Sequence, residues 1–288
     1  MPVRAIAAFS ILLLLSQPLP AQELDVPLAG EAEKSPLWEL GVGGGGTYTP
    51  DYPGADQSHL WGIPFPYAIY RGEILHSDRR GAARARWVKS VGYEFNVSAG
   101  GGLPSSSGEN SAREGMPNLE WLGEIGPRLM IDLFTHGENR LLRLGIPVRA
   151  AFSSNFEHVT DRGFLFAPEL LYDTPNLWNS GIDAYSLLTV NFAESRFGNY
   201  FYGVNPAYAT PSRPAFAAKP GYLLTDLTLG LTAPLGSDLK VSLNSSLQFL
   251  HGAANEGSPL FRSSFGSSVS LVIIWVFARS DEKVVTED

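Results

Sequence analysis

The sequence predicts an all-β protein, folded as a transmembrane antiparallel β-barrel with up-and-down topology. Three observations lead to this fold class. Long segments alternate apolar and polar residues with a period of two, which indicates β-strands. An apolar leader opens the chain, yet no later segment approaches the ~20 apolar residues of a transmembrane helix. Long loops and tight turns alternate between the segments, which is typical of barrels that span a bilayer.

The clearest strands lie in the last third of the chain, at 221–234, 237–250 and 264–277. Each is longer than the ~5–6 residues of a strand in a soluble sheet. In the segment 237–250, Leu239, Val241 and Leu243 share one face, and Lys240 and Ser242 share the other. The apolar face of such a strand is expected to meet lipid, and the polar face is expected to line the barrel interior.

The chain divides into four parts. Residues 1–21 resemble a secretory signal peptide, because Arg4 precedes a short apolar run and Ala21 suits a cleavage site. Residues 22–37 are polar, and we expect a flexible periplasmic lead-in there. Residues 38–278 are expected to form the barrel, and residues 279–288 a charged C-terminal tail. A cleaved leader followed by such strands indicates the outer membrane of a Gram-negative cell.

About twelve strands are expected, and ten is the alternative because the segments within 60–101 are short. Single-chain barrels of the outer membrane have an even number of strands. The strands are expected at 38–49, 60–71, 73–76, 82–88, 91–101, 119–134, 141–152, 164–172, 177–192, 221–234, 237–250 and 264–277.

The connections between these strands divide into two sets if the N-terminus starts in the periplasm. The outer connections are long and fall at 50–58, 102–117, 153–160, 193–220 and 251–261, with a short exception at 78–81. The inner connections are tight and fall at 71–72, 89–90, 135–139, 173–176 and 234–236. Long extracellular loops and short periplasmic turns are the asymmetry expected of such barrels.

The alternation also sorts the charged residues of the barrel. Folding 119–134 and 141–152 into a hairpin places Glu124 near Arg149 and Asp132 near Arg143, and we expect these as ion pairs across the strands. This charged ring is either a structural network that fills a narrow barrel or the lining of a path for small polar solutes. The charges expected in the lumen are Glu94, Glu120, Glu124, Arg128, Asp132, Arg143, Arg149, Glu169, Asp183, Asp226 and Lys240.

Few residues point to catalysis, cofactors or metals. The chain has no Cys, which excludes disulfides and cysteine-ligated metals, and its net charge of −8 argues against nucleic acid as a partner. A G-x-G-x-x-G spacing at 41–46 precedes a turn-rich loop, so glycine-rich strand packing is a simpler interpretation than a nucleotide site. The histidines match no metal-binding pattern. Ser246 and His251 are the pair we would test for an outer-membrane lipid hydrolase.

Several motifs together resemble the family of MltA-interacting proteins, also called the MipA/OmpV family. Residues 52–55 read Tyr-Pro-Gly-Ala after a glycine-rich strand, and residues 64–67 read Pro-Phe-Pro-Tyr. Residues 213–216 read Arg-Pro-Ala-Phe, where the family usually ends this motif with Tyr, and residues 258–260 read Ser-Pro-Leu. The chain departs from many such barrels by continuing past the terminal aromatic Phe277. The most specific motif is Arg196, Phe197, Gly198, Asn199, Tyr200, Phe201, Tyr202, Gly203 and Val204.

The resemblance implies an outer-membrane barrel. The member that gives the family its name is described as a scaffold for a lytic murein transglycosylase and a bifunctional penicillin-binding protein, and other members as porin-like proteins or antigens. We therefore expect a non-enzymatic, structural or scaffolding protein of the cell envelope, with outer-membrane lipid and these murein enzymes as partners. A narrow porin-like channel for small polar solutes is the alternative. The resemblance implies no catalytic residue and no cofactor.

The motif loop lies within 193–220, the longest connection expected outside the membrane. Loops above ~12–15 residues are usually functional or disordered. The aromatic content of this loop is too high for disorder. We therefore expect it to fold inward and to plug or constrict the barrel.

Overall fold

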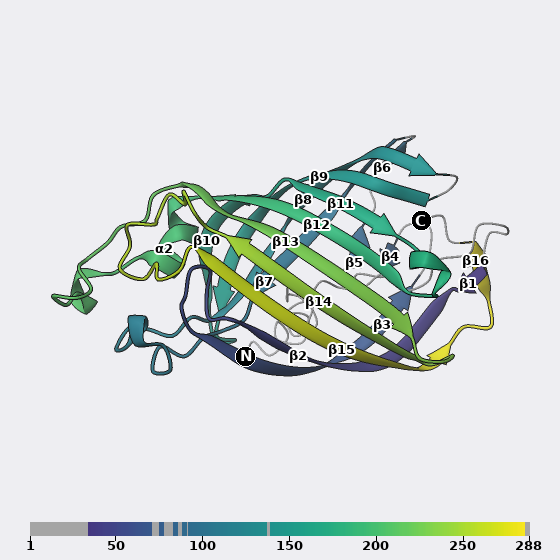
Figure 1. Ribbon diagram of the computed structural model, residues 1–288, viewed down its shortest axis with the longest axis horizontal. Coiled ribbons are helices and arrows are strands. Elements are labelled where there is room, and N and C mark those ends of the chain that lie inside the picture. The colour runs from purple at the N-terminus through teal and green to yellow at the C-terminus, as the bar shows by residue number, and fades with distance from the viewer. Residues whose placement is uncertain are drawn as a thin grey trace, which may run out of the picture.

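The long strands, whose side chains alternate between apolar and polar, form one curved antiparallel sheet (Figure 1). The computed structural model describes residues 34–70, 75–77, 83–85, 88–90, 92–136 and 139–285. The sheet contains β2 (Trp38–Pro50), β3 (Ser58–Tyr70), β6 (Val88–Ser90), β7 (Tyr93–Gly102), β8 (Trp121–His136), β9 (Asn139–Ser154), β10 (Val159–Phe166), β11 (Glu169–Thr174), β12 (Asp183–Ala193), β13 (Gly221–Pro234), β14 (Leu239–Phe249) and β15 (Phe265–Arg279). Its strands follow the order β3-β2-β15-β14-β13-β12-β10-β9-β8-β7-β6, and β11 pairs with β9 and β12.

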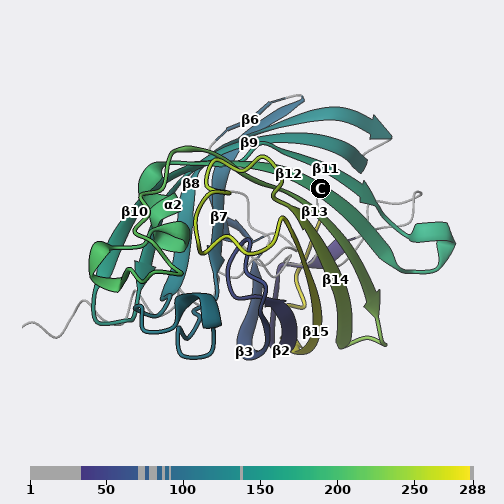
Figure 2. The ribbon, with the colours of Figure 1, turned by 60° about the vertical axis from the view of Figure 1, so that its left-hand side comes forward.

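The last long strand pairs with the first, which joins the two ends of the chain in one sheet. β15 lies antiparallel to β2, with Ile273 opposite Gly44, and β3 pairs with β2 along its whole length. The sheet curls around a central space (Figure 2), and the predicted antiparallel β-barrel is confirmed. Beyond β3, the described residues contain a short hairpin of β4 (Leu75–Ser77) and β5 (Ala83–Ala85). The strands predicted at 73–76 and 82–88 lie partly outside the described residues.

β15 shows how the alternating pattern separates the lipid face from the lumen. Its outward side chains are large and apolar: Leu271, Ile273 and Trp275 are about half exposed. The intervening side chains, among them Val272 and Ile274, are buried against the interior. In water such an exposed apolar band would be unfavourable, whereas in a bilayer it meets hydrocarbon.

The predicted strand 164–172 is divided in the structure. β10 ends at Phe166 and β11 begins at Glu169, because Pro168 has no N–H group to donate to a neighbouring strand. Both segments pair with β9 and β12, so together they occupy one position in the barrel wall. β10 also starts earlier than predicted, at Val159, and a bulge between Asp161 and Gly163 shifts its register with β9.

The predicted strand 177–192 begins later in the structure. β12 starts at Asp183, and Leu177–Asn179 forms the 3-10 turn η2 instead. Asn176 and Asn179 adopt positive φ angles there, a conformation that Asn tolerates better than most residues. The turn predicted at 173–176 is therefore longer, and it extends to the start of β12.

A bulge changes the face of one residue in β13. Asn191 pairs with Leu224, whereas Phe192 pairs with Tyr222, so Leu223 is left over between the two pairs. The alternating pattern places Leu223 on the lipid face, but in the structure it is buried, 5% exposed. The bulge turns this side chain inward, toward the loops that cover the barrel.

The end of the lead-in and the tail form a small strand pair outside the barrel. β1 (Lys34–Pro36) runs antiparallel to β16 (Lys283–Val285), with Ser35 opposite Val284. Residues 34–36 of the lead-in, which we expected to be flexible, are therefore in a strand. Residues 1–33 and 286–288, including the predicted signal peptide, lie outside the described residues.

The two ends of the barrel differ in the length of their connections (Figure 1). One end, the loop end, carries the connections 51–57, 103–120, 194–220 and 250–264, with the helix α2 (Ser195–Tyr202) and the 3-10 turns η1 (Ser111–Arg113) and η3 (Pro206–Tyr208). The other end, the turn end, carries the connections 175–182 and 235–238 and the β1–β16 pair. The connection predicted as a long loop at 153–160 is a short turn, 155–158, at the loop end. No helix in the described part of the chain is long and apolar enough to cross a membrane.

Candidate functional site

Buried charges connect β7, β8, β9 and β11 inside the barrel. The Arg128 guanidinium on β8 donates to Oε1 of Glu169 at 2.8 Å and to Oδ1 of Asn96 at 3.0 Å. Asn96 in turn donates to Glu94 at 2.6 Å. Arg128 and Glu169 are 8% and 7% exposed, so little water screens their attraction. Arg128 therefore links β7 to β11 across β9.

A second arginine extends this network. Nη1 of Arg149 donates to Oε2 of Glu124 at 3.3 Å, and Nη2 lies 3.7 Å from Oε2 of Glu169. Nε of Arg149 donates to the Ser98 hydroxyl at 2.8 Å. The Glu124 and Arg149 side chains thus meet where the hairpin of β8 and β9 places them. We call the whole group the charged wall: Glu94, Asn96, Glu124, Arg128, Arg149 and Glu169.

Gly145 makes room for the charged wall. It lies directly opposite Glu169 in the register of β9 and β11. A Cβ atom at position 145 would lie 2.5 Å from Cγ of Glu169, which is shorter than any normal contact between carbons. A glycine at this position therefore lets the Glu169 side chain reach Arg128.

Other predicted lumen charges lie closer to the turn end. Arg143 donates to Oδ2 of Asp173 at 2.8 Å, and Asp132 lies opposite Arg143 in the register of β8 and β9. Lys240 donates to Oε2 of Glu39 at 3.2 Å. Both cations are at most 9% exposed. The turn end of the lumen therefore holds its own buried ion pairs.

Two of the predicted lumen charges belong to the ends of the barrel. Asp183 accepts the backbone N–H of Asn176 within the turn that precedes β12. Glu120 lies one residue before β8, where it accepts from the Ser153 hydroxyl at 2.6 Å and lies 3.1 Å from Nε2 of His158. Glu120 is therefore part of the rim at the loop end.

Neutral polar groups follow β13, β14, β15 and β2. The Thr232 and Ser242 hydroxyls lie 2.8 Å apart, and the Ser270 hydroxyl donates to that of Thr47 at 2.8 Å. The inward positions of these strands alternate with outward apolar residues, so their hydroxyls meet across neighbouring strands. We call this group the hydroxyl wall: Thr47, Thr228, Thr232, Ser242, Asn244, Ser246 and Ser270.

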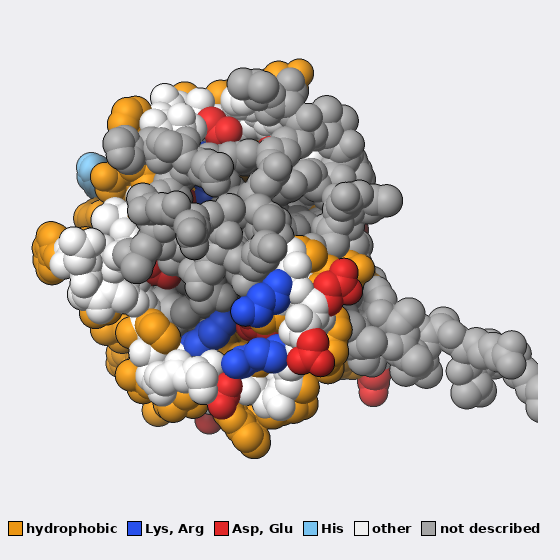
Figure 3. All heavy atoms as spheres, turned by 90° about the vertical axis from the view of Figure 1, so that its right-hand side faces the viewer, with side chains coloured by type: hydrophobic (Ala, Val, Ile, Leu, Met, Phe, Trp, Pro, Cys, Tyr) orange, Lys and Arg blue, Asp and Glu red, His pale blue; other side chains and the backbone are white. Residues whose placement is uncertain are grey.

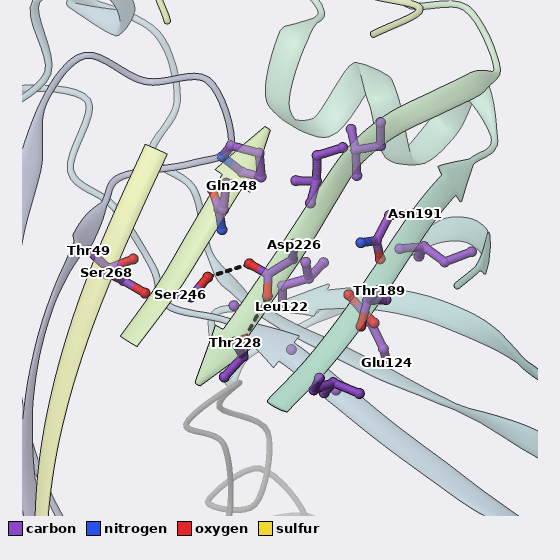
Figure 4. Close-up of a pocket in the computed structure, with 18 of the residues that line it drawn as sticks. Thr49, Leu122, Glu124, Thr189, Asn191, Asp226, Thr228, Ser246, Gln248 and Ser268 are labelled. Carbon is purple, nitrogen blue, oxygen red and sulfur yellow. Dashed lines mark hydrogen bonds between the residues drawn. The ribbon is translucent and has the colours of Figure 1, made fainter. Parts of the chain in front are cut away.

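Asp226 is the carboxylate that sits among these hydroxyls (Figure 4). It accepts from the Thr228 hydroxyl at 2.6 Å and from the Ser246 hydroxyl. Within the described residues, no lysine, arginine or histidine forms an ion pair with it. The predicted lumen position of Asp226 thus has a different environment from that of Glu124 or Glu169, each of which contacts an arginine.

An aromatic cap packs at the loop end above these two walls. Its members are Tyr52, Phe197, Tyr200, Phe201 and Tyr202, all at most 8% exposed. Four of them come from α2, which lies within the motif loop 196–204, and their rings contact one another edge to face or at a tilt. The motif loop therefore packs into the protein and does not extend into solvent.

Phenol hydroxyls tie the cap to the other loops. Tyr202 donates to the Pro53 carbonyl at 2.9 Å, and Tyr52 donates to the Leu260 carbonyl at 2.8 Å. Tyr200 donates to the Glu120 carbonyl at 2.6 Å. Burial raises the pKa of Tyr52 to about 12 and raises the pKa of Tyr200 and Tyr202 further. All three phenols therefore stay protonated and able to donate at neutral pH.

Arg113 fastens the loop 103–120 to the same cap. Its guanidinium donates to the carbonyls of Phe201 and Pro117 at 3.1 and 3.2 Å, and it lies 5.7 Å from the centre of the Tyr52 ring. The side chain is 4% exposed. Burial lowers the pKa of Arg113 from its usual value. Carbonyl oxygens and a ring face hold this cation, as cation–π contacts allow.

A cavity of about 410 Å³ lies between the two walls and beneath the cap. Figure 4 shows Asp226, Ser246 and Gln248 lining it from β13 and β14, and Glu124 lining it from β8. Phe197 and Phe201 border it from the cap. The volume falls in the range of pockets that hold small molecules.

Sequence reasoning missed several polar partners of this interior. Glu39 and Asn96 occupy inward positions of alternating strands, so the alternation could have placed both side chains in the lumen. The predicted set of lumen residues omitted Glu39 and did not include neutral residues such as Asn96. Arg113 had no such signal, because a loop has no period that fixes the direction of its side chains. The glycine-rich run 41–46 lies inside β2, and a Cβ on Gly43 would meet the Phe65 ring at 2.3 Å. Close packing accounts for this glycine.

The pair considered for lipid hydrolysis does not form. The Ser246 hydroxyl donates to Asp226 inside the barrel. His251 lies in the loop that follows β14, where its side chain is 94% exposed and its Nδ1 is 3.6 Å from Oε1 of Glu256. A serine that faces the lumen and a histidine in solvent cannot act as nucleophile and base.

The fold and the interior together define a class. An antiparallel barrel with an apolar outer band, buried ion pairs inside and long loops gathered at one end is a transmembrane β-barrel of the outer-membrane type. Residues 42–277 match the family model described as MltA-interacting protein MipA, so the chain belongs to this family. This match bears out the family resemblance of the sequence motifs.

Other comparisons give weaker likenesses. No curated protein matches the chain. Among solved structures, the NanC porin has a TM-score of 0.37 at 9% identity, over 82% of this chain and 98% of that chain. Outer membrane phospholipase A from Escherichia coli has 0.31 at 10% identity, over 82% and 92%. OccK3 from Pseudomonas aeruginosa has 0.25 at 8% identity, over 83% and 95%. Likenesses this low carry no argument about function.

Proposed function

We propose that this protein is a sealed outer-membrane barrel that serves as a scaffold for murein enzymes in the cell envelope. The observation that supports a sealed barrel is the aromatic cap, which joins four loops through buried rings and hydrogen bonds. The family description supports a scaffold, because it names interaction with MltA. The partners we propose are a lytic transglycosylase of the MltA type and a penicillin-binding protein.

The turn end is the surface that would meet enzymes in the periplasm. Seen from that end, Lys and Arg side chains gather beside Asp and Glu side chains (Figure 3). Arg279 contributes to it: its guanidinium lies 2.8 Å from Oδ1 of Asp238 and donates to the Ser237 carbonyl. Glu282 and Lys283 are exposed beyond the barrel, next to the β1–β16 pair. Exposed charges of both signs at this rim would steer a partner protein toward the turn end and would fix its orientation there.

Capture of purified partners tests the scaffold. The refolded protein is incubated with an immobilised lytic transglycosylase of the MltA type, and binding is measured. Exchanging the charges of Glu282 and Lys283 (Glu282→Lys with Lys283→Glu) should weaken capture without changing the net charge. The matched control exchanges the exposed Asp161 and Arg196 at the loop end (Asp161→Arg with Arg196→Asp) and should leave capture unchanged. Equal capture by all three proteins, or none by the native one, would reject the proposed surface.

A narrow channel is the second candidate, and the polar cavity between the walls favours it. Single-channel recording in a planar bilayer separates the two. A sealed barrel should be silent, and deletion of residues 196–216 should open it. Heat-modifiable migration on gels verifies that each protein is folded. Discrete conductance steps from the native protein would favour the channel over the sealed scaffold.

A further inference from the structure

The cavity beneath the aromatic cap contains more acid than base. Among the described residues that line it are the carboxylates of Asp51, Glu124, Glu169 and Asp226, but only two guanidinium groups, those of Arg128 and Arg149. Both arginines are engaged by Glu124 and Glu169. The cavity therefore favours a positively charged guest over an anion or a neutral sugar.

Asp226 is the place where a cation would bind. Its oxygens accept from the Thr228 and Ser246 hydroxyls, and no lysine, arginine or histidine of the described residues forms an ion pair with it. Beside it on β14, Oε1 of Gln248 is buried and has no hydrogen-bond partner within the described part of the protein. A protonated amine offers three donors and could satisfy both groups.

Asn244 adds an independent sign that the cavity holds a ligand. The residue is 2% exposed, and its Oδ1 accepts from the Tyr185 hydroxyl at 3.0 Å. Its Nδ2 is buried and has no partner in the described residues. A buried donor without a partner is unfavourable, and an acceptor atom on a ligand would remove this cost. Asn244 lines the same cavity as Asp226.

From these contacts we propose that the cavity binds a small basic amino acid or a close relative of one. Its side-chain amine would bind Asp226 and Oε1 of Gln248, and its carboxyl or carbonyl oxygen would accept from Nδ2 of Asn244. The cavity of about 410 Å³ is large enough for such a molecule. This inference does not depend on the scaffold role, because no murein enzyme takes part in it.

Isothermal titration calorimetry of the refolded protein in detergent tests the proposal with three probes. L-lysine carries both groups, norleucine lacks the side-chain amine, and cadaverine lacks the carboxylate. The Kd of lysine should be at least about tenfold lower than the Kd of norleucine, and it should also be lower than the Kd of cadaverine. Equal binding of lysine and norleucine, or no binding of lysine to folded protein, would overturn the proposal without any variant.

Variants then locate the site. Asp226→Asn keeps the shape of the side chain but removes its charge, and it should weaken lysine binding about tenfold or more. The matched control Asp238→Asn removes a carboxylate from the exposed turn end, far from the cavity lining, and should leave binding unchanged. Migration on unheated gels verifies folding of both variants. Unchanged affinity in folded Asp226→Asn would reject Asp226 as the binding group and overturn the proposal.

Discussion

The two walls of the lumen are encoded by the same alternating pattern but are held together differently. In the charged wall, Arg128 on β8 reaches across β9 and joins Asn96 on β7 to Glu169 on β11. In the hydroxyl wall, hydroxyl contacts such as that of Thr232 with Ser242 join neighbouring strands, and the longer Tyr185 side chain reaches across β13 to Asn244. Long charged side chains therefore couple distant strands, whereas short hydroxyls only fasten adjacent ones. Breaking the charged wall should cost more, and its damage should spread further.

The largest effect is expected for Arg128→Met. The substitution keeps much of the side-chain volume but leaves Glu169 with the more distant Arg149 and leaves Asn96 without the guanidinium. Removing one partner of a buried ion pair typically costs about 3–5 kcal/mol, because the other charge remains buried. Denaturant unfolding of the refolded barrel, followed by tryptophan fluorescence, measures the loss.

The matched control is Arg279→Met at the turn end. Arg279 also pairs with a carboxylate at 2.8 Å, but its side chain is 38% exposed, and exposed pairs contribute about 0–1 kcal/mol. If both substitutions cost the same, burial in the charged wall would not be the source of its stability.

A smaller effect is expected from titration of the aromatic cap. Burial raises the pKa of Tyr52 to about 12. The folded state therefore holds this proton more tightly than the unfolded chain, so the contribution is complete below pH ~10 and is lost as the pH rises toward 12. The full shift corresponds to roughly 2–3 kcal/mol. Tyr52→Phe should flatten this part of the stability profile, measured by unfolding at several pH values. A profile with the same slope in both proteins would contradict the assignment to Tyr52.

The sequence was sufficient to predict the direction of side chains in the strands, because residues there alternate with a period of two. Alternation places Glu124, Arg128 and Arg149 on one face, and hairpin register brings Glu124 and Arg149 together. It does not reveal that Glu169 joins them, because that contact crosses β9 and depends on the space left by Gly145. Residues on strands that are not neighbours in the sheet, such as Arg128 and Glu169, come together only when the whole barrel has formed.

Bulges and loop contacts could not be predicted from the alternation of apolar and polar residues. Leu223 is buried because a bulge opposite Asn191 shifts the parity of β13 by one residue. Arg113 lies in a loop, and its three contacts come from parts of the chain as far apart as Pro117 and Phe201. The aromatic content of 193–220 predicted an inward fold, but residues 205–212 are exposed, and composition could not indicate this division of the loop.

The smallest effect is expected in the hydroxyl wall. Thr232→Val removes one hydroxyl and leaves that of Ser242, which is fully buried, without this partner. A buried polar group left without a partner costs about 1–3 kcal/mol, whereas removing both partners can be nearly neutral. The double variant Thr232→Val with Ser242→Ala should therefore regain most of the stability that the single variant loses. Denaturant unfolding of both proteins measures this recovery. If the double variant were less stable than Thr232→Val alone, the hydroxyl wall would act as a coupled network like the charged wall, and the distinction between the two walls would fail.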